Sequence, residues 1–584
     1  MSSVKKAQPK LDSSAGKLLF LGSILEQNIF PFPKIKDEEA ETLRMILDSI
    51  DKFMQPKAAD FKQYDEEGAQ PSEYIEALKE LGLFGLIIPE SFDGLGLSNT
   101  GYSRVLQHTS RYDSSTSLTV GAHSSIGMKG LLLFGTDAQK KKYLPKLASG
   151  EMIAAFCLTE PGSGSDAGSI KTNATCNPDG SWTLNGEKIW ITNGPLADFF
   201  TVFARTEGEQ GKLTAFIIER SFGGLTTGPK EDKMGIRASA TSTVHFENTR
   251  VPAECVLGEP GKGFKIAMSI LNNGRTGLGG GCVGGMKRCI EMAVRQASER
   301  KQFGKSISEF GLIKEKISQM TVNCFATESV VSMVGHYIDS GLDDFSVEAA
   351  ISKVFASESL WSVAHEALQI AGGNGFMKEY PYEVVVRDSR INLIFEGTNE
   401  ILRLYIGLSG LKDAGEYLKE ISSSVGKIFD DPIKGFGVLS RDATKRVTGL
   451  TSIGREKLSC VHPALREQAS VYEEYTQRLS RASEELLRRY KKEIIGQQFP
   501  TKRVADIAID LFVGLCVLSR VTSLLEERGA EKCAEELSIA HIFTQQAKRR
   551  MNQNIRRLIQ NEDDEMRTLS DFIVGKGGYP WDTI

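Results

Sequence analysis

The hydrophobic period of the chain changes twice, and this limits the possible fold more than any other feature. Residues 37–153 carry apolar side chains at helical spacing, as in "EEAETLRMILDSIDKFM". Between residues 154 and 262 the pattern changes to short runs such as "DFFTVFART" and "KLTAFIIER", broken by Asn-Gly, Gly-Gly and Pro turns. That pattern is typical of an antiparallel barrel or sandwich. Helical spacing returns over residues 263–410, so we predict a mainly α protein with a central β domain.

The remaining residues predict three further segments. A chain of 584 residues is too long for one core. We expect an N-terminal arm over residues 1–36, a linker over 411–462 and an extra helical domain over 463–584. Within residues 425–460, seven Lys or Arg and four Asp or Glu alternate with apolar residues. This mixture fits a solvated linker or a segment lying in a membrane interface, and both interpretations stay open.

Charge and cysteine content exclude several classes of protein. The formal net charge is −4, which provides no basic field for a nucleic-acid backbone. The nine cysteines are scattered without a CxxC pair, which favours a reducing compartment over disulfides or structural zinc. The longest apolar run, "AIDLFVGLCVL", is too short to span a bilayer, and the N-terminus lacks a secretory h-region. We expect a bacterial cytoplasmic protein, with or without peripheral contact to the inner membrane. The alternative is the mitochondrial matrix or inner membrane.

One glycine-rich segment imitates a dinucleotide-binding motif. In "GGGCVG", the residues Gly279, Gly281 and Gly284 satisfy GxGxxG. A true fingerprint follows a strand, whereas this segment follows the helical pattern "FKIAMSILNNGR". We therefore interpret these glycines as small residues that allow close helix packing.

Three other segments can carry chemistry. In "AAFCLTEPGSGSDAGS", backbone N–H groups freed by Gly162 and Gly164 can form a polar cradle, although a plain loop explains them equally well. In "KIWITNG", strand alternation places Trp190 and Thr192 on one face, where they can contact a planar ring. In "LIFEGTNEIL", the acid Glu396 stands directly after three apolar residues and before a glycine.

Taken together, these segments resemble a known family. "FCLTEPGSGSD", "KIWITNG", "ERKQFGK", "QIAGGNGF" and "IFEGTNEI" follow one another in the order found in the acyl-CoA dehydrogenase flavoenzymes. The resemblance extends over roughly residues 37–410. The extra C-terminal domain, with "NIFPFP", "LNNGR" and "FGLIKEK", is similar to the very-long-chain branch, which includes family member nine.

The resemblance implies an FAD site and assigns residues to it. Those expected around the isoalloxazine are Phe156, Cys157, Leu158, Thr159, Ser165, Trp190 and Thr192. Those expected to reach the adenosine and pyrophosphate end of a partner subunit's FAD are Arg300, Gln302, Phe303, Gln369, Gly372 and Gly373. Thr398 and Asn399 would also contact FAD. A shared site of this kind implies a homodimer.

The resemblance also implies that Glu396 is the catalytic base of an α,β-desaturation of acyl-CoA thioesters. We expect Ile394 and Phe395 to desolvate its carboxylate and raise its pKa. Ser165, Arg275 and Gly397 are the expected substrate contacts. Some branches carry the base at the position of Gly274, which has no acid here.

The sequence and the resemblance also suggest the length of the acyl chain and the electron acceptor. Gly121, Ala122, Ser124 and Ser125 are small and leave room for a long acyl tail, although small residues also permit tight helix packing. The family's usual acceptor is electron-transfer flavoprotein. Two alternatives remain open: a fold-retaining protein of respiratory-complex assembly, and an acyl-CoA oxidase.

Overall fold

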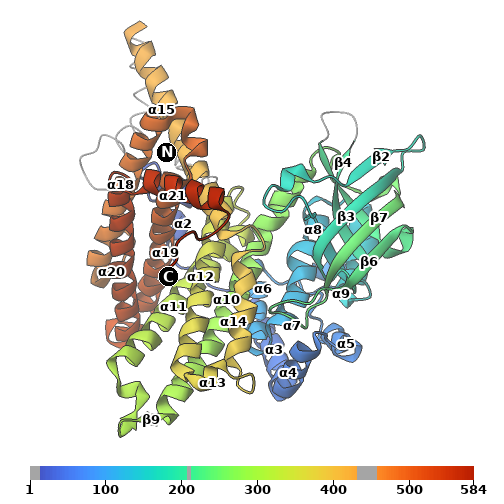
Figure 1. Ribbon diagram of the computed structural model, residues 1–584, viewed down its shortest axis with the longest axis horizontal. Coiled ribbons are helices and arrows are strands. Elements are labelled where there is room, and N and C mark those ends of the chain that lie inside the picture. The colour runs from blue at the N-terminus through green and yellow to red at the C-terminus, as the bar shows by residue number, and fades with distance from the viewer. Residues whose placement is uncertain (1–13, 207–211, 431–456, 584) are drawn as a thin grey trace, which may run out of the picture. The chain divides into compact units, whose positions relative to one another are not determined.

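A computed structural model describes residues 14–206, 212–430 and 457–583, and two compact units divide the chain between them (Figure 1). One unit extends from Phe32 to Ile401. The other combines the residues up to Pro31 with those from Leu402 onward. The predicted N-terminal arm is therefore divided between the two units. Much of the predicted linker, residues 431–456, lies outside the described residues, so the membrane interpretation is not tested there.

The first part of the larger unit is helical, as predicted. Its α-helices are α3 (Asp37–Met54), α4 (Ala58–Glu67), α5 (Ser72–Glu80), α6 (Asn99–Tyr112), α7 (Ser114–Gly121), α8 (Lys129–Phe134) and α9 (Asp137–Ser149). A π-helical turn over Ala122–Gly127 interrupts the run between α7 and α8. Such turns are rare and often occur at functional sites.

The central domain is an eight-stranded sheet with the strand order β6-β7-β3-β2-β4-β5-β8, and β1 pairs in parallel with β4. Its strands are β1 (Ala154–Cys157), β2 (Asn173–Cys176), β3 (Trp182–Thr192), β4 (Phe199–Thr206), β5 (Leu213–Glu219), β6 (Leu225–Lys230), β7 (Thr241–Val251) and β8 (Val256–Leu257). Strands β4 and β5 are buried on both faces, because apolar residues of α8 and α9 join the core of the sheet. This explains why their sequences are continuously apolar rather than alternating.

A second helical bundle completes the larger unit. It contains α10 (Gly263–Glu299), α11 (Gly311–Asp339), α12 (Ser346–Ala371), α13 (Gly373–Phe376) and α14 (Tyr382–Arg390), with the short hairpin of β9 (Lys301–Gln302) and β10 (Lys305–Ser306). Helix α10 packs against both α6 and α12. The predicted order of helical, β and helical domains is confirmed.

The other unit is also helical. It contains α1 (Ala15–Leu19), α2 (Glu26–Ile29), α18 (Arg466–Tyr490), α19 (Gln498–Arg528), α20 (Ala534–Arg557) and α21 (Asp563–Lys576). Helix α15 (Asn399–Asp430) begins in the larger unit and continues past residue 411, where a linker was predicted. The prediction of a linker is wrong over residues 411–430. Gly, Ser and Lys in "KEISSSVGK" suggested a loop, but the helix propagates through them.

Three features concern the described residues only. No helix there is both long and apolar enough to cross a bilayer. No group of His, Cys, Asp and Glu in that part of the chain is suited to holding a metal ion. The nine cysteines are free thiols.

Candidate active site

Glu396 stands in a turn between α14 and α15, in a backbone conformation that non-glycine residues seldom adopt. Its φ is +59°, and Gly397 follows with a φ of +92°. A left-handed non-glycine residue costs of order 1–2 kcal/mol, which the surrounding structure must offset. Gly397 is therefore required by backbone geometry, in addition to the substrate access expected from the sequence.

The carboxylate of Glu396 is poised for proton transfer. Within the described residues its Oε2 atom is buried and accepts no hydrogen bond. Burial raises the pKa of Glu396 to about 7, while the nearby charges of Arg275 and Lys353 act in the opposite direction. Phe395 lines the same pocket, as predicted, but Ile394 is 47% exposed. The prediction that Ile394 desolvates the carboxylate is therefore wrong, because its side chain faces solvent.

The raised pKa has a consequence for pH dependence. A carboxylate acts as a base only when deprotonated, so for the desaturation that the resemblance implies, kcat/KM should fall about tenfold for each pH unit below about 7. The stability effect has the opposite sign. Because the pKa is raised on folding, the protonated form stabilises the fold at low pH, and this contribution is lost as pH rises through 7. Rates between pH 5 and 9 check this, and a profile flat down to pH 5 would contradict it.

Lys353 on α12 holds the turn that carries Glu396. Its buried ammonium donates to the Gly397 carbonyl and to Asn399 Oδ1, each at 2.8 Å. Burial lowers the pKa of Lys353 to about 8, so it stays largely charged at neutral pH. Sequence reasoning missed this residue. The available signal was one lysine inside the apolar segment "EAAISKVFAS", because a charge in such a segment is rarely buried without a partner.

The same network engages the side chain of Asn399, one of the predicted cofactor contacts. Asn399 is buried, and its side-chain amide donates to Ser357 Oγ at 3.0 Å and to Glu358 Oε1 at 3.1 Å. Its oxygen accepts from Lys353, so the polar groups of this side chain are engaged inside the protein. Thr398 Oγ1 accepts from the Ile401 backbone N–H and thereby caps α15. Glu400 lies in the first turn of that helix.

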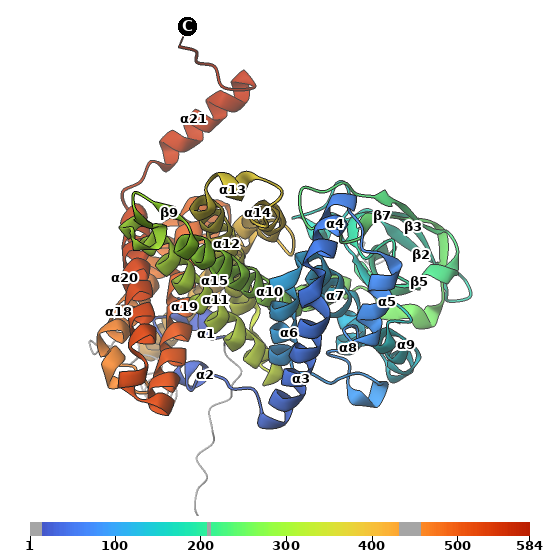
Figure 2. The ribbon, with the colours of Figure 1, turned by 90° about the horizontal axis from the view of Figure 1, so that it is seen from below.

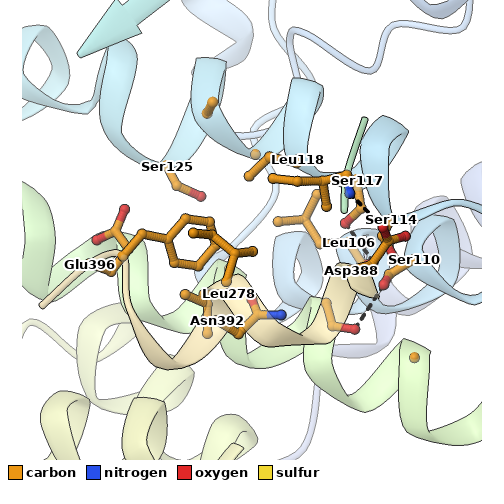
Figure 3. A pocket seen from close by; sticks show the side chains of 18 of the residues that line it. Leu106, Ser110, Ser114, Ser117, Leu118, Ser125, Leu278, Asp388, Asn392 and Glu396 are labelled. Carbon is orange, nitrogen blue, oxygen red and sulfur yellow. Dashed lines mark hydrogen bonds between the residues drawn. The ribbon is translucent and has the colours of Figure 1, made fainter. Parts of the chain in front are cut away.

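A pocket leads away from Glu396 between α7, α10 and α14 (Figure 3). Four glycines of α10 line one wall: Gly274, Gly277, Gly281 and Gly285. Gly121, Ala122 and Ser125, which were expected to leave room for a long tail, line another wall, whereas Ser124 is fully buried. A β-carbon at position 274 would lie 3.6 Å from Glu396 Oε2, so this position is adjacent to the base.

The glycines of the false dinucleotide motif divide into two groups. A β-carbon on Gly279 would meet Val331 Cγ2 at 2.7 Å, and one on Gly284 would collide with the Gln107 carbonyl, so these two permit close packing. A β-carbon on Gly281 would meet nothing closer than Ser117 Oγ at 3.7 Å. The packing interpretation is therefore correct for two of the three, while Gly281 keeps the pocket open.

The predicted flavin loop follows β1. Cys157 and Leu158 are buried in the β core, whereas Phe156 and Thr159 are partly exposed and Ser165 is exposed. The thiol of Cys157 therefore faces the core and not a ligand surface. The fully buried Lys188 Nζ donates to the Leu158 carbonyl at 3.1 Å and to Glu160 Oε1 at 2.8 Å. This pair fixes the start of the loop.

Trp190 is exposed, Ile191 is buried and Thr192 is partly exposed, so these three residues alternate as predicted. The pairing of β3 with β7 shifts register between Lys188 and Ile191, and Trp190 has a φ of +58°. The indole is 65% exposed. Trp190 thus stands at a register shift, and such irregularities re-aim side chains beside functional sites in many sheets.

The residues predicted to reach a partner subunit's cofactor are exposed. They are Arg300, Gln302, Phe303, Gln369, Gly372 and Gly373. Arg300 caps α10 and Gly372 caps α12, and Figure 1 places β9 and α13 at the same end of the bundle. The phenyl ring of Phe303 is 93% exposed, which is unusual for so large an apolar side chain.

These surfaces fit a flat cofactor with phosphates. β-Carbons built on Gly162, Gly164, Gly372 and Gly373 would meet no atom within 4 Å, so a ligand can approach the backbone closely at these positions. The exposed indole of Trp190 adds an aromatic face, and Arg300 adds a guanidinium that suits phosphate oxygens.

Comparisons with known proteins agree with this arrangement. Residues 40–151, 155–249 and 261–411 match the N-terminal, middle and C-terminal domains of acyl-CoA dehydrogenase, and residues 463–579 match the ACAD9/ACADV C-terminal domain. The mitochondrial very long-chain specific acyl-CoA dehydrogenase of Bos taurus is 44% identical, over 96% of this chain and 87% of the relative. A probable acyl-CoA dehydrogenase of Bacillus subtilis is 35% identical, over 93% of this chain and 90% of the relative.

A solved structure extends the similarity to the fold of nearly the whole chain. The crystal structure of a Bacillus anthracis acyl-CoA dehydrogenase complexed with FAD has a TM-score of 0.79 and 33% sequence identity. The match covers 96% of this chain and 94% of that chain.

Proposed function

The chain belongs to the acyl-CoA dehydrogenase family, and from that premise we propose that it desaturates long-chain and very-long-chain acyl-CoA thioesters to trans-2-enoyl-CoA in fatty-acid oxidation. FAD, when bound, supplies the acceptor for the hydride that leaves the β-carbon. The observation that carries the proposal is the buried Oε2 atom of Glu396, which accepts no hydrogen bond from the described residues and lies at one end of a pocket walled by small residues.

Each residue of the site has a distinct role in this proposal. Glu396 removes the α-proton, and its raised pKa brings the base close to the working pH. Lys353 holds the turn so that the Glu396 carboxylate faces the pocket. Arg275, which is buried and acts electrostatically on Glu396, limits the rise in its pKa. The residues that would hold the cofactor are Phe156, Thr159, Ser165, Trp190, Thr192 and Thr398.

We also propose that the protein forms a homodimer and passes its electrons to electron-transfer flavoprotein. Phe303 and Phe376, 93% and 80% exposed, lie in the segments that contain Gln302 and Gly373. A second copy covering them would bury apolar surface and bring Arg300 to its cofactor. Reduced cofactor must be reoxidised, and electron-transfer flavoprotein is the proposed acceptor. The relatives come from mitochondria and from bacteria, and both proposed settings are compatible with them.

The proposed function is tested by turnover with a panel of acyl-CoA thioesters from butanoyl to octadecanoyl. Electron-transfer flavoprotein serves as the acceptor, and the product is identified as the trans-2-enoyl thioester. We expect the highest kcat/KM with the long chains. Turnover confined to butanoyl-CoA would contradict the proposed chain length.

Filling the pocket should shift the preferred chain length. Gly281→Leu places an isobutyl group in the pocket. Its β-carbon would lie at ordinary van der Waals distance from the nearest atom, Ser117 Oγ at 3.7 Å. We expect the ratio of kcat/KM for hexadecanoyl-CoA to that for octanoyl-CoA to fall by at least about tenfold. Gly281→Ala is the matched control and should change this ratio less. An unchanged ratio in the leucine variant would show that the acyl tail does not pass Gly281.

A further inference from the structure

The pocket that begins at Glu396 ends among polar side chains. Figure 3 shows Glu396 and Ser125 at one end, Leu118, Leu278 and Asn392 between, and Ser110, Ser114, Ser117 and Asp388 with Leu106 at the other end. Along α10 the lining extends from Gly274 to Gly285, a separation of eleven steps or about 16.5 Å at 1.5 Å per residue. A saturated hydrocarbon tail offers nothing to a polar end wall. The composition of this distal end therefore needs a separate explanation.

Asp388 is the central group of the distal end. Its side chain is more than nine-tenths buried, and Oδ1 accepts from the Ile236 backbone N–H. The other carboxyl oxygen, Oδ2, accepts no hydrogen bond from any residue that the structure describes. The hydroxyl of Ser114 is likewise without a hydrogen-bond partner in the described part of the chain. Both residues line the pocket, so a carboxyl oxygen and a hydroxyl are available to a ligand there.

The hydroxyls of Ser110 and Ser117 already donate their protons to backbone carbonyls, so they can only accept a hydrogen bond from a ligand. Ser110 Oγ donates to the Gly281 carbonyl at 2.8 Å, and Ser117 Oγ donates to the Leu106 carbonyl at 3.2 Å. Their lone pairs remain, so the distal end presents acceptors to whatever enters it. A methyl terminus would leave these acceptors desolvated and unpaired, which is costly in a buried site.

The charges around Asp388 disfavour an anionic group on the ligand and favour a neutral one. Burial raises the pKa of Asp388 to about 7, the charges of Asp113 and Asp65 raise it further, and Arg387 lowers it. A second carboxylate would therefore meet an acidic environment. A hydroxyl can donate to Asp388 when that group is ionised and accept from it when it is protonated.

We propose that the distal end binds a hydroxyl group on the terminal carbon of the acyl chain, so that ω-hydroxyacyl-CoA thioesters are substrates of this enzyme. The proposal rests on the proposed function, because it assigns the far end of the same acyl pocket. It predicts a preference that depends on length, since only chains of matching length place the hydroxyl beside Asp388 and Ser114.

The test compares ω-hydroxyacyl-CoA with plain acyl-CoA of equal length, from octanoyl to octadecanoyl. The measured quantity is the ratio of the two kcat/KM values at each length. We expect a maximum at intermediate length, at least about tenfold above the ratio for octanoyl. ω-Carboxyacyl-CoA should show no such maximum. A ratio below one at every length would overturn the proposal, whereas failure of the plain acyl-CoAs as well would overturn the proposed function.

Two variants test the assignment to named residues. Asp388→Asn keeps an oxygen to accept from Ile236 but removes the negative charge, and Ser114→Ala removes the free hydroxyl. Each should lower the ratio at the best length by about tenfold or more, and plain acyl-CoA of the same length normalises any general loss. Flavin content and thermal unfolding check that both variants fold. A maximum that stays unchanged in both variants would also overturn the proposal.

Discussion

Glu396→Gln is expected to lower the rate of acyl-CoA desaturation by about 10²- to 10⁴-fold, the usual contribution of a general base. Glutamine keeps the size of the side chain but cannot remove the α-proton. The variant should still bind FAD and acyl-CoA, because the groups proposed to hold both are unchanged. Above pH 7 it should also unfold at a higher temperature than the wild type, since a buried charge has been removed. Stopped-flow reduction and thermal unfolding measure these two effects.

Glu400→Gln is the matched control for this variant. Glu400 lies four residues further on, is exposed and belongs to the first turn of α15. Loss of the Glu400 charge should leave the rate of desaturation within about twofold of the wild-type rate, because exposed charges contribute little. Near wild-type turnover in Glu396→Gln, or an equal loss in both variants, would rule out Glu396 as the base.

Lys353→Met should produce the second largest effect. The substitution removes the Lys353 donor to the Gly397 carbonyl and to Asn399 Oδ1, and a buried acceptor left unpaired costs about 1–3 kcal/mol. We expect kcat to fall by at least about tenfold because the turn that aims Glu396 is released. The pH profile should move upward, because the charge of Lys353 lowers the pKa of Glu396 in the wild type.

Lys129→Met separates positioning from general stability. Lys129 is also buried, has a pKa lowered to about 8 and donates to Asn99 Oδ1 at 3.1 Å, away from the Glu396 turn. Its loss should lower the temperature of unfolding without moving the pH profile. If Lys353→Met behaves in the same way, Lys353 supports the fold and does not position the base.

The sequence predicted the domain order from a local signal, and the family resemblance singled out Glu396 as the candidate base. The change of hydrophobic period at the β domain is visible over short windows. Glu396, Gly397 and Phe395 stand in one short segment, and the structure adds the positive φ that makes Gly397 necessary. The pocket wall was foreseen in Gly121, Ala122 and Ser125.

The remaining features depend on contacts between residues distant in sequence. Lys353 meets Gly397 across 44 positions, and Asp388 meets Ile236 across 152, so neither role has a local signature. The prediction for Ile394 was wrong because residues adjacent in sequence to Glu396 need not lie on the same side of the turn as its carboxylate. Trp190 lies on the face that alternation predicted, but the register shift beside it left no local signal in the sequence.

The most direct test of the central claim is anaerobic mixing of the FAD-loaded protein with hexadecanoyl-CoA while the yellow flavin absorbance is followed. We expect rapid bleaching with formation of trans-2-hexadecenoyl-CoA, and slow or absent bleaching in Glu396→Gln at equal FAD content. Flavin that stays oxidised in the wild-type protein with hexadecanoyl-CoA and every other chain length would contradict it.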